Sequence, residues 1–324
     1  MKAWGWLGLV IAFIPLLIWA ELGWNGYLLQ LFMFLGLYIA LTVSLNLVNG
    51  LTDIFSLGHA AFMALGAYTS ALLTLPLSRR ATAFPALPEW FQTLVLPFPL
   101  ALLLGALVAA LVAYIIGLPL LRLKGHYLSV GTLALLVIVE TLATNMDFLT
   151  RGPRGISGIP VYSNAYWVWG ITLLIIYLTV RLKNSSFGLA FSAIRLDDIA
   201  AASLGIRTVR YRLFAFVLSA AMAGVIGGLW AHLVRVISPH VFSYGITFQV
   251  VAMLVVGGLG SVSGSVLGAS LLFLIPEALR YVERQGSFGL SQILVAVLLI
   301  LIVIFRPQGL LGRNQARRRA KEVV

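Results

Sequence analysis

Long stretches of this chain contain no Asp, Glu, Lys or Arg, and most of them are long enough to cross a bilayer as a helix, which needs roughly 20 apolar residues. Hydrophobic residues make up 61% of the 324 positions and charged residues 10%, against about half and a quarter in soluble domains. The uncharged stretches include residues 3–20, 22–52, 91–121, 155–180, 236–276 and 286–305. The sequence therefore predicts an all-α integral membrane protein.

About ten transmembrane helices are predicted when the chain is divided at charges, Gly/Pro clusters and interfacial aromatic residues. The first of them resembles a signal peptide, but Trp19-Ala20-Glu21 is a poor cleavage site, so we interpret it as a retained span. Residues 1–312 are predicted to form one transmembrane domain and residues 313–324 a basic cytoplasmic tail. The predicted spans cover approximately residues 3–20, 27–48, 56–75, 94–117, 128–148, 165–182, 211–234, 246–259, 264–279 and 288–305.

The basic residues predict the orientation of these spans. If both termini are cytoplasmic, fifteen Lys and Arg residues lie inside and seven outside, which favours this orientation because Lys and Arg resist translocation. The net charge of +12 does not indicate a nucleic-acid partner, because the cations lie between apolar runs and not along one helix face. The seven outer cations are Arg79, Arg80, Arg151, Arg154, Arg235, Arg280 and Arg284.

The longest polar interruption, residues 181–212, contains a predicted short helix outside the bilayer. Asp197 and Asp198 favour a helix N-terminus, and Gly205 can adopt the left-handed conformation that ends a helix. Arg195 and three later arginines flank this helix. Two interpretations remain open: the helix docks into a groove on a cytoplasmic partner, or it only tethers two spans.

Irregular backbone is predicted where the second span ends and the third begins. The polar residues Asn46, Ser56 and His59 gather there around Gly58. Irregular backbone at membrane depth is tolerated where protein or a water-filled cavity surrounds it. These four residues are therefore candidates for a translocation pathway, and a tight turn between neighbouring spans is the alternative.

A second irregular segment is predicted at residues 254–269, where glycine and serine interrupt an apolar stretch. A pattern of Leu, Gly and Ala within residues 57–72 recurs there, 202 positions later. An internal repeat of the kind found in transporters explains this recurrence, and so does chance among three common residues.

Glu140 lies inside the predicted fifth span. A charge at this depth costs at least a few kcal/mol unless it is paired or hydrated, so we expect it to face the interior of the bundle. It is a fifth candidate for the pathway, and a structural hydrogen bond is the alternative.

The residue types that enzymes of common classes require are missing from the sequence. No cysteine is present, so no disulfide or thiolate site is possible. Neither the Gly-x-x-x-x-Gly-Lys-Ser/Thr phosphate loop nor the His-Glu-x-x-His zinc motif occurs. We expect no enzymatic activity, no cofactor and no metal site.

Five motifs follow one another along the chain. They are residues 54–73, Gly155-Ile-Ser-Gly-Ile-Pro160, residues 193–206, Val256-Gly-Gly-Leu-Gly-Ser261 and Phe305-Arg-Pro-Gln-Gly-Leu-Leu-Gly312. In this order they resemble the motifs of bacterial ABC importer permeases of the branched-chain amino acid type, specifically the second of the two permease subunits of that system. The similarity extends from about residue 45 to residue 312.

The resemblance implies a ten-helix permease fold in the bacterial inner membrane, with a coupling helix between the sixth and seventh spans. It implies a homologous second permease, two cytoplasmic ATPases that hydrolyse the ATP, an external solute-binding protein and surrounding membrane lipid. The candidate coupling-helix residues are Arg195, Asp197, Asp198, Ala201, Ala202 and Gly205.

Two departures from the family pattern bear on the solute. Arg151-Gly-Pro-Arg154 stands where a Gly- or Ser-rich acidic stretch is frequent, and His126 stands where an acid is common. Branched-chain or other hydrophobic amino acids are the expected solutes. Urea, short amides and aromatic acids are alternatives within the same architecture, and an ion-gradient-driven secondary transporter is an alternative of another class.

Overall fold

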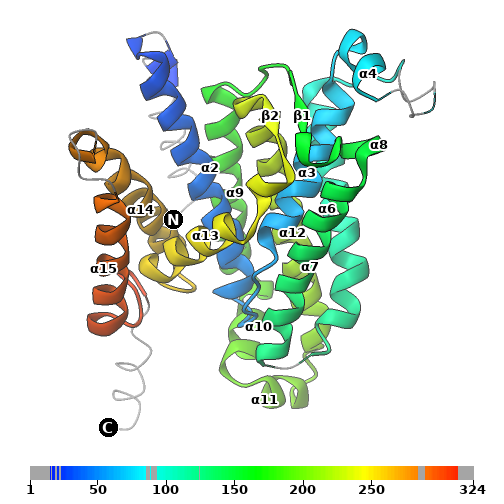
Figure 1. Cartoon of the computed structure of the whole chain (residues 1–324). Coiled ribbons are helices and arrows are strands. Elements are labelled where there is room, and N and C mark those ends of the chain that lie inside the picture. The colour runs from blue at the N-terminus through cyan, green and yellow to red at the C-terminus, as the bar shows by residue number, and fades with distance from the viewer. Residues whose placement is uncertain are drawn as a thin grey trace.

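A computed structural model shows a body built almost entirely of helices (Figure 1). The structure describes residue 15, residue 88 and residues 17–18, 20–21, 23–84, 93–123, 125–283 and 289–312. Only residues 15, 17–18 and 20 of the predicted first span are among them, and the predicted basic tail lies wholly outside them. The long helices are α2 (Gly26–Asn49), α3 (His59–Thr74), α6 (Phe98–Leu120), α7 (His126–Asn145), α9 (Ala165–Lys183), α12 (Thr208–Val234), α13 (Tyr244–Gly257), α14 (Val262–Glu283) and α15 (Leu290–Phe305).

Short elements close the two ends of the bundle. One end carries α4 (Leu77–Ala83), α8 (Asp147–Thr150) and the 3-10 helix η1 (Gly152–Arg154), and the other carries α10 (Ser186–Leu196) and α11 (Asp198–Ser203), as Figure 1 shows. A second 3-10 helix, η2 (Pro239–Phe242), leads into α13.

The centre of the bundle is a tight contact of α12 with α3 and α6. A Cβ atom on Gly66 would lie 2.0 Å from the carbonyl oxygen of Gly224, and one on Gly227 would lie 1.9 Å from that of Met63. Glycine at these positions lets the helix backbones touch. In lipid the hydrophobic effect does not drive helices together, so their association relies on the close packing that small residues allow.

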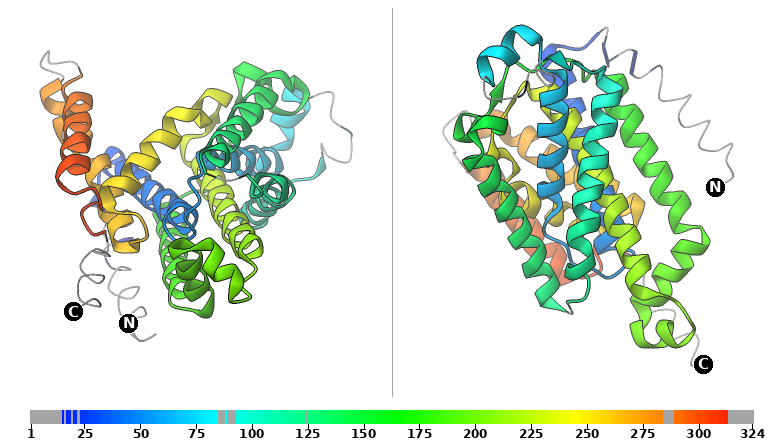
Figure 2. Two further views of the ribbon diagram at one scale, coloured as in Figure 1. Left: turned by 90° about the horizontal axis from the view of Figure 1, so that it is seen from below. Right: turned by 90° about the vertical axis from the view of Figure 1, so that its right-hand side faces the viewer.

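The last three helices form a smaller layer beside this centre (Figure 2). α14 packs against α13, α2 and α15. α15 lies at the outer edge of the molecule, next to α14 (Figures 1 and 2). Both α13 and α14 pack against α2, which packs in turn against α12. α2 therefore connects the smaller layer to the central helices.

A two-stranded antiparallel ribbon joins two loops at the end of the bundle that carries α4 and α8. It pairs β1 (Ile156–Ser157) with β2 (Val236–Ile237), with Ile156 opposite Ile237. Both isoleucines are buried. The sequence did not predict this ribbon, which fixes the loop before α9 to the loop after α12.

The outer surface is apolar, as a membrane protein requires. On α6, the exposed residues Leu103, Leu107, Leu111 and Ile115 follow one another at intervals of four and form a stripe along the helix.

Among the described residues, seven helices are long and apolar enough to cross a membrane. The chain is a multi-pass membrane protein with an all-helical bundle. α3 and α15 contain 16 residues each, which at about 1.5 Å per residue is shorter than the roughly 30 Å hydrocarbon core, so ten spans remain a prediction.

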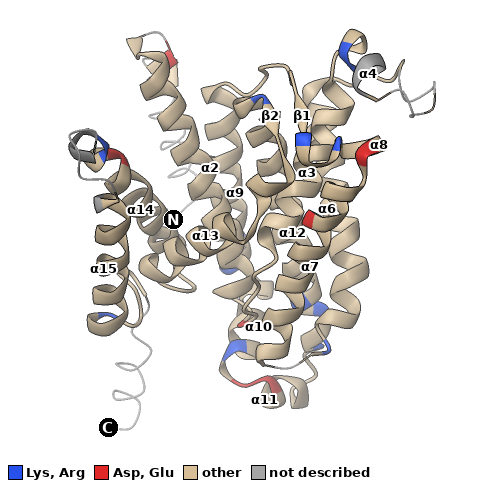
Figure 3. Cartoon of the chain, viewed as in Figure 1, with Lys and Arg blue, Asp and Glu red and all other residues tan. Residues whose placement is uncertain are grey.

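The charged residues gather toward the two ends of the bundle (Figure 3). This arrangement agrees with the predicted division of the Lys and Arg residues between loops on the two sides of the membrane. Which side is the cytoplasm stays a prediction. Arg80 differs from an ordinary loop cation because it is fully buried, and its guanidinium donates to the carbonyl oxygens of Leu72 and Leu94. It thereby satisfies a carbonyl in the last turn of α3.

Candidate functional site

An irregular segment, residues 50–58, separates α2 from α3 and is called the first break; it is buried except at Asp53, Phe55 and the half-buried Leu57. The backbone N–H of Ser56 donates to Asn49 Oδ1 (3.0 Å), and Asn49 Nδ2 donates to the carbonyl oxygen of Ser56 (3.2 Å). The N–H of Leu57 donates to Thr132 Oγ1 on α7 (2.9 Å). Irregular backbone is thus present where the sequence predicted it, with its polar groups paired inside the protein.

Gly58 and His59 lie at the start of α3, where the chain leaves the first break. A Cβ atom on Gly58 would lie 2.7 Å from the carbonyl oxygen of Thr132, so only glycine fits against α7. His59 is buried, and its Nε2 lies 2.7 Å from Ser44 Oγ. Ser44 Oγ also lies 2.9 Å from the carbonyl oxygen of Leu41, so this hydroxyl connects His59 with the backbone of α2.

Residues 258–261, the second break, separate α13 from α14. Gly258 and Gly260 have φ angles of 108° and 80°, which L-residues with a side chain rarely adopt. Ser261 closes the N-terminus of α14, because its Oγ accepts from the N–H of Gly264 (3.1 Å). The C-terminal motif packs here, since the N–H groups of Leu310 and Leu311 donate to the carbonyls at the end of α13 (2.8 and 3.1 Å).

Asn46 joins the two breaks. Its side chain is fully buried, and its Oδ1 accepts a hydrogen bond from the N–H of Gly260 (2.8 Å). Its backbone carbonyl accepts from the N–H groups of Gly50 and Leu51 (2.9 and 3.1 Å). One residue of α2 therefore holds both irregular segments together.

Two cations bind to the same pair of segments. Arg195, in the last turn of α10, donates to the carbonyl oxygen of Gly50 (2.6 Å). Lys183, at the end of α9, donates to that of Gly260 (2.6 Å). The sequence analysis placed Arg195 beside the candidate coupling helix but assigned Lys183 only a role in orientation, because nothing local indicates a partner 77 residues away.

The short helix predicted between the sixth and seventh spans is present as α11. Asp197 accepts from the N–H groups of Ile199 and Ala200 (2.9 and 3.0 Å) and so caps its N-terminus, and Gly205 ends it with a φ of 84°. Asp198 pairs with Arg212 of α12 at 2.9 Å. The predicted capping of this helix is confirmed, and its role in coupling stays a prediction.

The side chains of the α10–α11 region divide into an inner and an outer set. Ala201 is buried, whereas Ala202 is exposed. Three large apolar side chains project outward: Leu196, Ile199 and Leu204 are 66, 83 and 80% exposed. Such exposure at the end of a bundle marks an apolar surface that a partner protein can cover.

Glu140 does not join the group around Asn46, Ser56, Gly58 and His59. Its carboxylate Oε1 lies 3.4 Å from Nδ1 of His240 in η2, and its side chain is 21% exposed. Thr132, which contacts the first break, is eight residues earlier on α7 and so about 12 Å away along the helix axis. The expectation that Glu140 faces inward is met only in part.

A sequence model of the family described as branched-chain amino acid transport system / permease component matches residues 27–303. The chain belongs to this family. The chain is 33% identical, over 319 residues, to the high-affinity branched-chain amino acid transport system permease protein LivM of Salmonella typhimurium, an alignment covering 88% of this chain and 70% of that protein. LivM of Escherichia coli is 32% identical over the same shares.

The chain is also similar to the other permease of that system. LivH of Escherichia coli is 31% identical over 194 residues, which cover 54% of this chain and 61% of LivH. No solved structure matches this chain. The resemblance inferred from the five motifs, to a LivM-like permease, is therefore confirmed by the family match and by the identity to LivM.

Proposed function

We propose that this chain is the transmembrane permease subunit of an ATP-driven importer for branched-chain or other hydrophobic amino acids. It works with a homologous second permease, two cytoplasmic ABC ATPases and an external solute-binding protein, and it lies in the inner membrane with both termini in the cytoplasm. ATP hydrolysis takes place on the partner chains. The membership of the family and the similarity to LivM and LivH support this proposal.

The observation that carries the proposal is the outward apolar surface of α11. Ile199 and Leu204 stand on opposite ends of a helix that is capped by Asp197 and tied to α12 through Asp198. A short rigid helix with exposed apolar side chains suits a groove on a partner protein. We propose that this groove belongs to the ATPase and that α11 is the coupling helix.

The movement of α11 would reach the spans through the two cations. Arg195 lies two residues before Asp197, the N-cap of α11, and donates a hydrogen bond to the first break. Lys183 donates one to the second break. Both bonds are charge-assisted and short, so they transmit displacement well. We propose that nucleotide-driven closure of the ATPases moves the two breaks together, which alternates access between the two membrane faces.

The test is co-purification of the ATPase subunits with the tagged chain. Ile199→Asp places a charge in the proposed groove, and an unpaired charge that loses its water is strongly unfavourable. We expect the amount of ATPase recovered to fall at least tenfold, which corresponds to about 1.4 kcal/mol. Tyr127→Asp is the matched control, because Tyr127 is 77% exposed near the start of α7.

The control variant should recover the ATPases as the wild type does. Equal recovery with Ile199→Asp would overturn the docking role of α11. If the purified single chain transports leucine when only an ion gradient is applied, the importer mechanism itself is wrong. Uptake of labelled leucine by the reconstituted complex, in competition with urea and benzoate, decides the solute class.

A further inference from the structure

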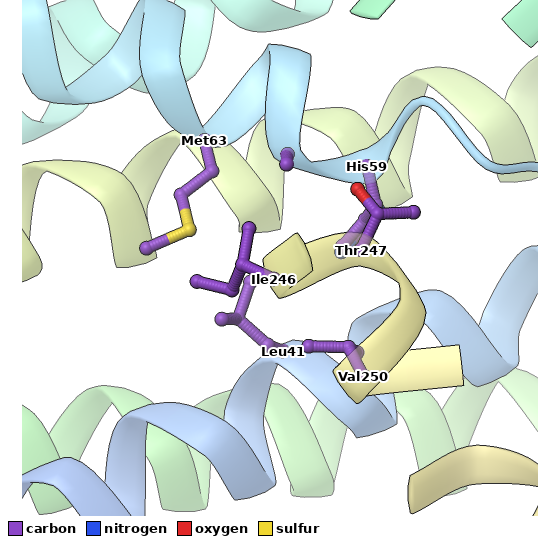
Figure 4. Close-up of a pocket in the computed structure, with 7 residues that line it drawn as sticks. Leu41, His59, Met63, Ile246, Thr247 and Val250 are labelled. Carbon is purple, nitrogen blue, oxygen red and sulfur yellow. The ribbon is translucent and has the colours of Figure 1, made fainter. Parts of the chain in front are cut away.

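The helix α13 has two faces of different character. Its inner residues Ile246, Thr247 and Val250 line a small pocket together with Leu41 and Met63 of α2 and α3 (Figure 4). The pocket has room for about one water molecule, and the buried hydroxyl of Thr247 has no hydrogen-bond partner within the described part of the chain. An amino acid therefore has no space on the inner face of α13.

The outer face of α13 exposes a polar group at membrane depth. The exposed residues Tyr244, Phe248 and Gln249 lie on this face. Gln249 is near the middle of the candidate span Pro239–Gly257, which has 19 residues. Its Oε1 accepts a hydrogen bond from the hydroxyl of Tyr38 on α2 (3.3 Å), whereas its Nε2 donates to no other residue that the structure describes. Hydrocarbon offers this N–H group no acceptor, so lipid is an unfavourable neighbour for the outer face of α13.

An aromatic cluster holds the partner of Gln249 in place. The ring of Tyr38 contacts the rings of Trp230 on α12 and Phe273 on α14, with centroids 5.7 and 5.3 Å apart. Packing of this kind restricts the position of the Tyr38 hydroxyl. The amide oxygen of Gln249 is thus occupied, and its Nε2 is left for a neighbour outside the chain.

Titratable groups lie at the start of the same face. His240 in η2 is exposed and precedes Tyr244 and Phe248 at intervals of four residues. Its Nδ1 lies 3.4 Å from the carboxylate of Glu140, which is partly exposed in the last two turns of α7. Loss of hydration is unfavourable for such groups in lipid and in a dry protein interface alike. Water is therefore the environment that suits this face from His240 to Gln249.

The apolar stripe on α6 is the contrasting surface of this chain. None of its four side chains is polar, as expected where a helix faces lipid. Leu107 of this stripe is 54% exposed and Phe248 of α13 is 52% exposed. The two surfaces are thus equally open and differ in their chemistry.

We propose that the outer face of α13, from His240 to Gln249, lines a water-filled route through which the solute passes in the assembled importer. Gln249 and the carboxylate of Glu140 supply hydrogen-bonding groups to water and to the polar end of an amino acid, and a carboxylate can pair with its ammonium group. Tyr244 and Phe248 offer apolar surface to its aliphatic side chain. This inference rests on the proposed function and adds to it a wall of the route.

The absence of cysteine from this chain allows a test with one introduced thiol at a time. The complex of this chain with its second permease and both ATPases is placed in lipid nanodiscs and treated with a trimethylammonium thiosulfonate, a charged thiol reagent that does not enter lipid. The thiolate is the reactive form, and it is disfavoured in hydrocarbon. We therefore expect Gln249→Cys and Phe248→Cys to be labelled more than about tenfold faster than the matched control Leu107→Cys. Labelling is read from the mass of this chain alone.

A second measurement tests whether the water lies on the route of the solute. ATP-driven uptake of labelled leucine into proteoliposomes, with the solute-binding protein added, is measured for each variant before and after treatment with the reagent. The attached charged group should remove most of the uptake of Gln249→Cys and Phe248→Cys relative to the untreated variant. Leu107→Cys should lose none, and the cysteine-free wild type controls for reaction with the partner chains.

Labelling of both Gln249→Cys and Phe248→Cys as slow as that of Leu107→Cys would overturn the inference and place the outer face of α13 against lipid or a partner subunit. Fast labelling that leaves uptake intact would overturn it too, because the water would then lie off the route. In both cases the proposed function stands if the wild-type importer takes up leucine. If the wild-type importer takes up none, the proposed function fails whatever the labelling rates are.

Discussion

The two breaks in the membrane helices are built from similar residues but differ in how their following helix begins. In the second break, Ser261 caps α14, and Gly258, which has a positive φ angle, lies against the C-terminal segment. In the first break, α3 starts at Gly58 without a side-chain cap within the described residues and faces a pocket. Both breaks are held by a cation at a backbone carbonyl.

This difference separates two tasks that one helix interruption can perform. A capped start has its N–H groups satisfied and can act as a firm connection. An uncapped start retains polar groups for a ligand. The second break is therefore expected to be the firmer of the two connections, and the first the more yielding one. Three changes test this division, in order of decreasing expected effect.

The largest effect is expected from Gly258→Ala compared with Gly58→Ala. Gly258 has a φ of 108°, and a Cβ there would lie 2.6 Å from the backbone nitrogen of Gly312, so strain and overlap add to at least about 3 kcal/mol. Gly58 has an ordinary φ of −93° and one close contact. We expect Gly258→Ala to lower the apparent Tm in detergent by about 10 °C, and Gly58→Ala to lower it less.

The control for this pair is Gly170→Ala in α9, where an added Cβ meets no atom within 4 Å. Its Tm should equal or exceed that of the wild type, because alanine favours a helix over glycine. A larger loss from Gly58→Ala than from Gly258→Ala would show that the first break, and not the second, is the rigid one.

An intermediate effect is expected from Arg195→Met and Lys183→Met, which remove the cation from the first and second break. We expect ATP hydrolysis by the assembled complex to continue while leucine uptake falls about tenfold, a loss of coupling near 1.4 kcal/mol. Because Asn46 ties the breaks together, the double variant should be little worse than either single one. Uptake per ATP hydrolysed is the measurement.

Arg181→Met is the matched control, since the Arg181 guanidinium lies over the ring of Tyr177 (5.8 Å) and contacts neither break. Its ratio of uptake to hydrolysis should be unchanged. Losses that multiply in the Arg195→Met/Lys183→Met variant would mean that the two breaks move independently.

The smallest effect is expected from Ser261→Ala, which removes the cap of α14. Loss of such a cap costs about 1 kcal/mol, so the apparent Tm should fall by about 3 °C with leucine binding unchanged. Ser203→Ala, at the exposed end of α11, is the control. Weakened leucine binding in Ser261→Ala would place the second break at the solute.

Local patterns were sufficient to predict the helices and the short helix α11. Apolar runs predicted the positions of nine described helices from α2 to α15, and the carboxylate of Asp197 and the left-handed Gly205 predicted the ends of α11. These features depend on neighbours a few residues away. The sequence also predicted that the chain is irregular near Gly58.

Contacts between distant residues could not be predicted in this way. The pairing of Ile156 with Ile237, the bond from Lys183 to Gly260 and the burial of Arg80 all depend on which helices become neighbours. Thr247 gave no signal either, because a threonine in an apolar helix ordinarily bonds to its own backbone. Glu140 was placed in the correct helix, but its contact with His240 was not predicted.

The glycine contacts at the centre of the bundle limit where a solute can travel. Gly66, Gly105 and Gly224 bring α3, α6 and α12 so close that an added methyl group on Gly66 would overlap the next backbone. No molecule as wide as leucine passes between main chains in contact. These three helices therefore form one solid wall, and under the proposed function a route for the solute has to lie outside it.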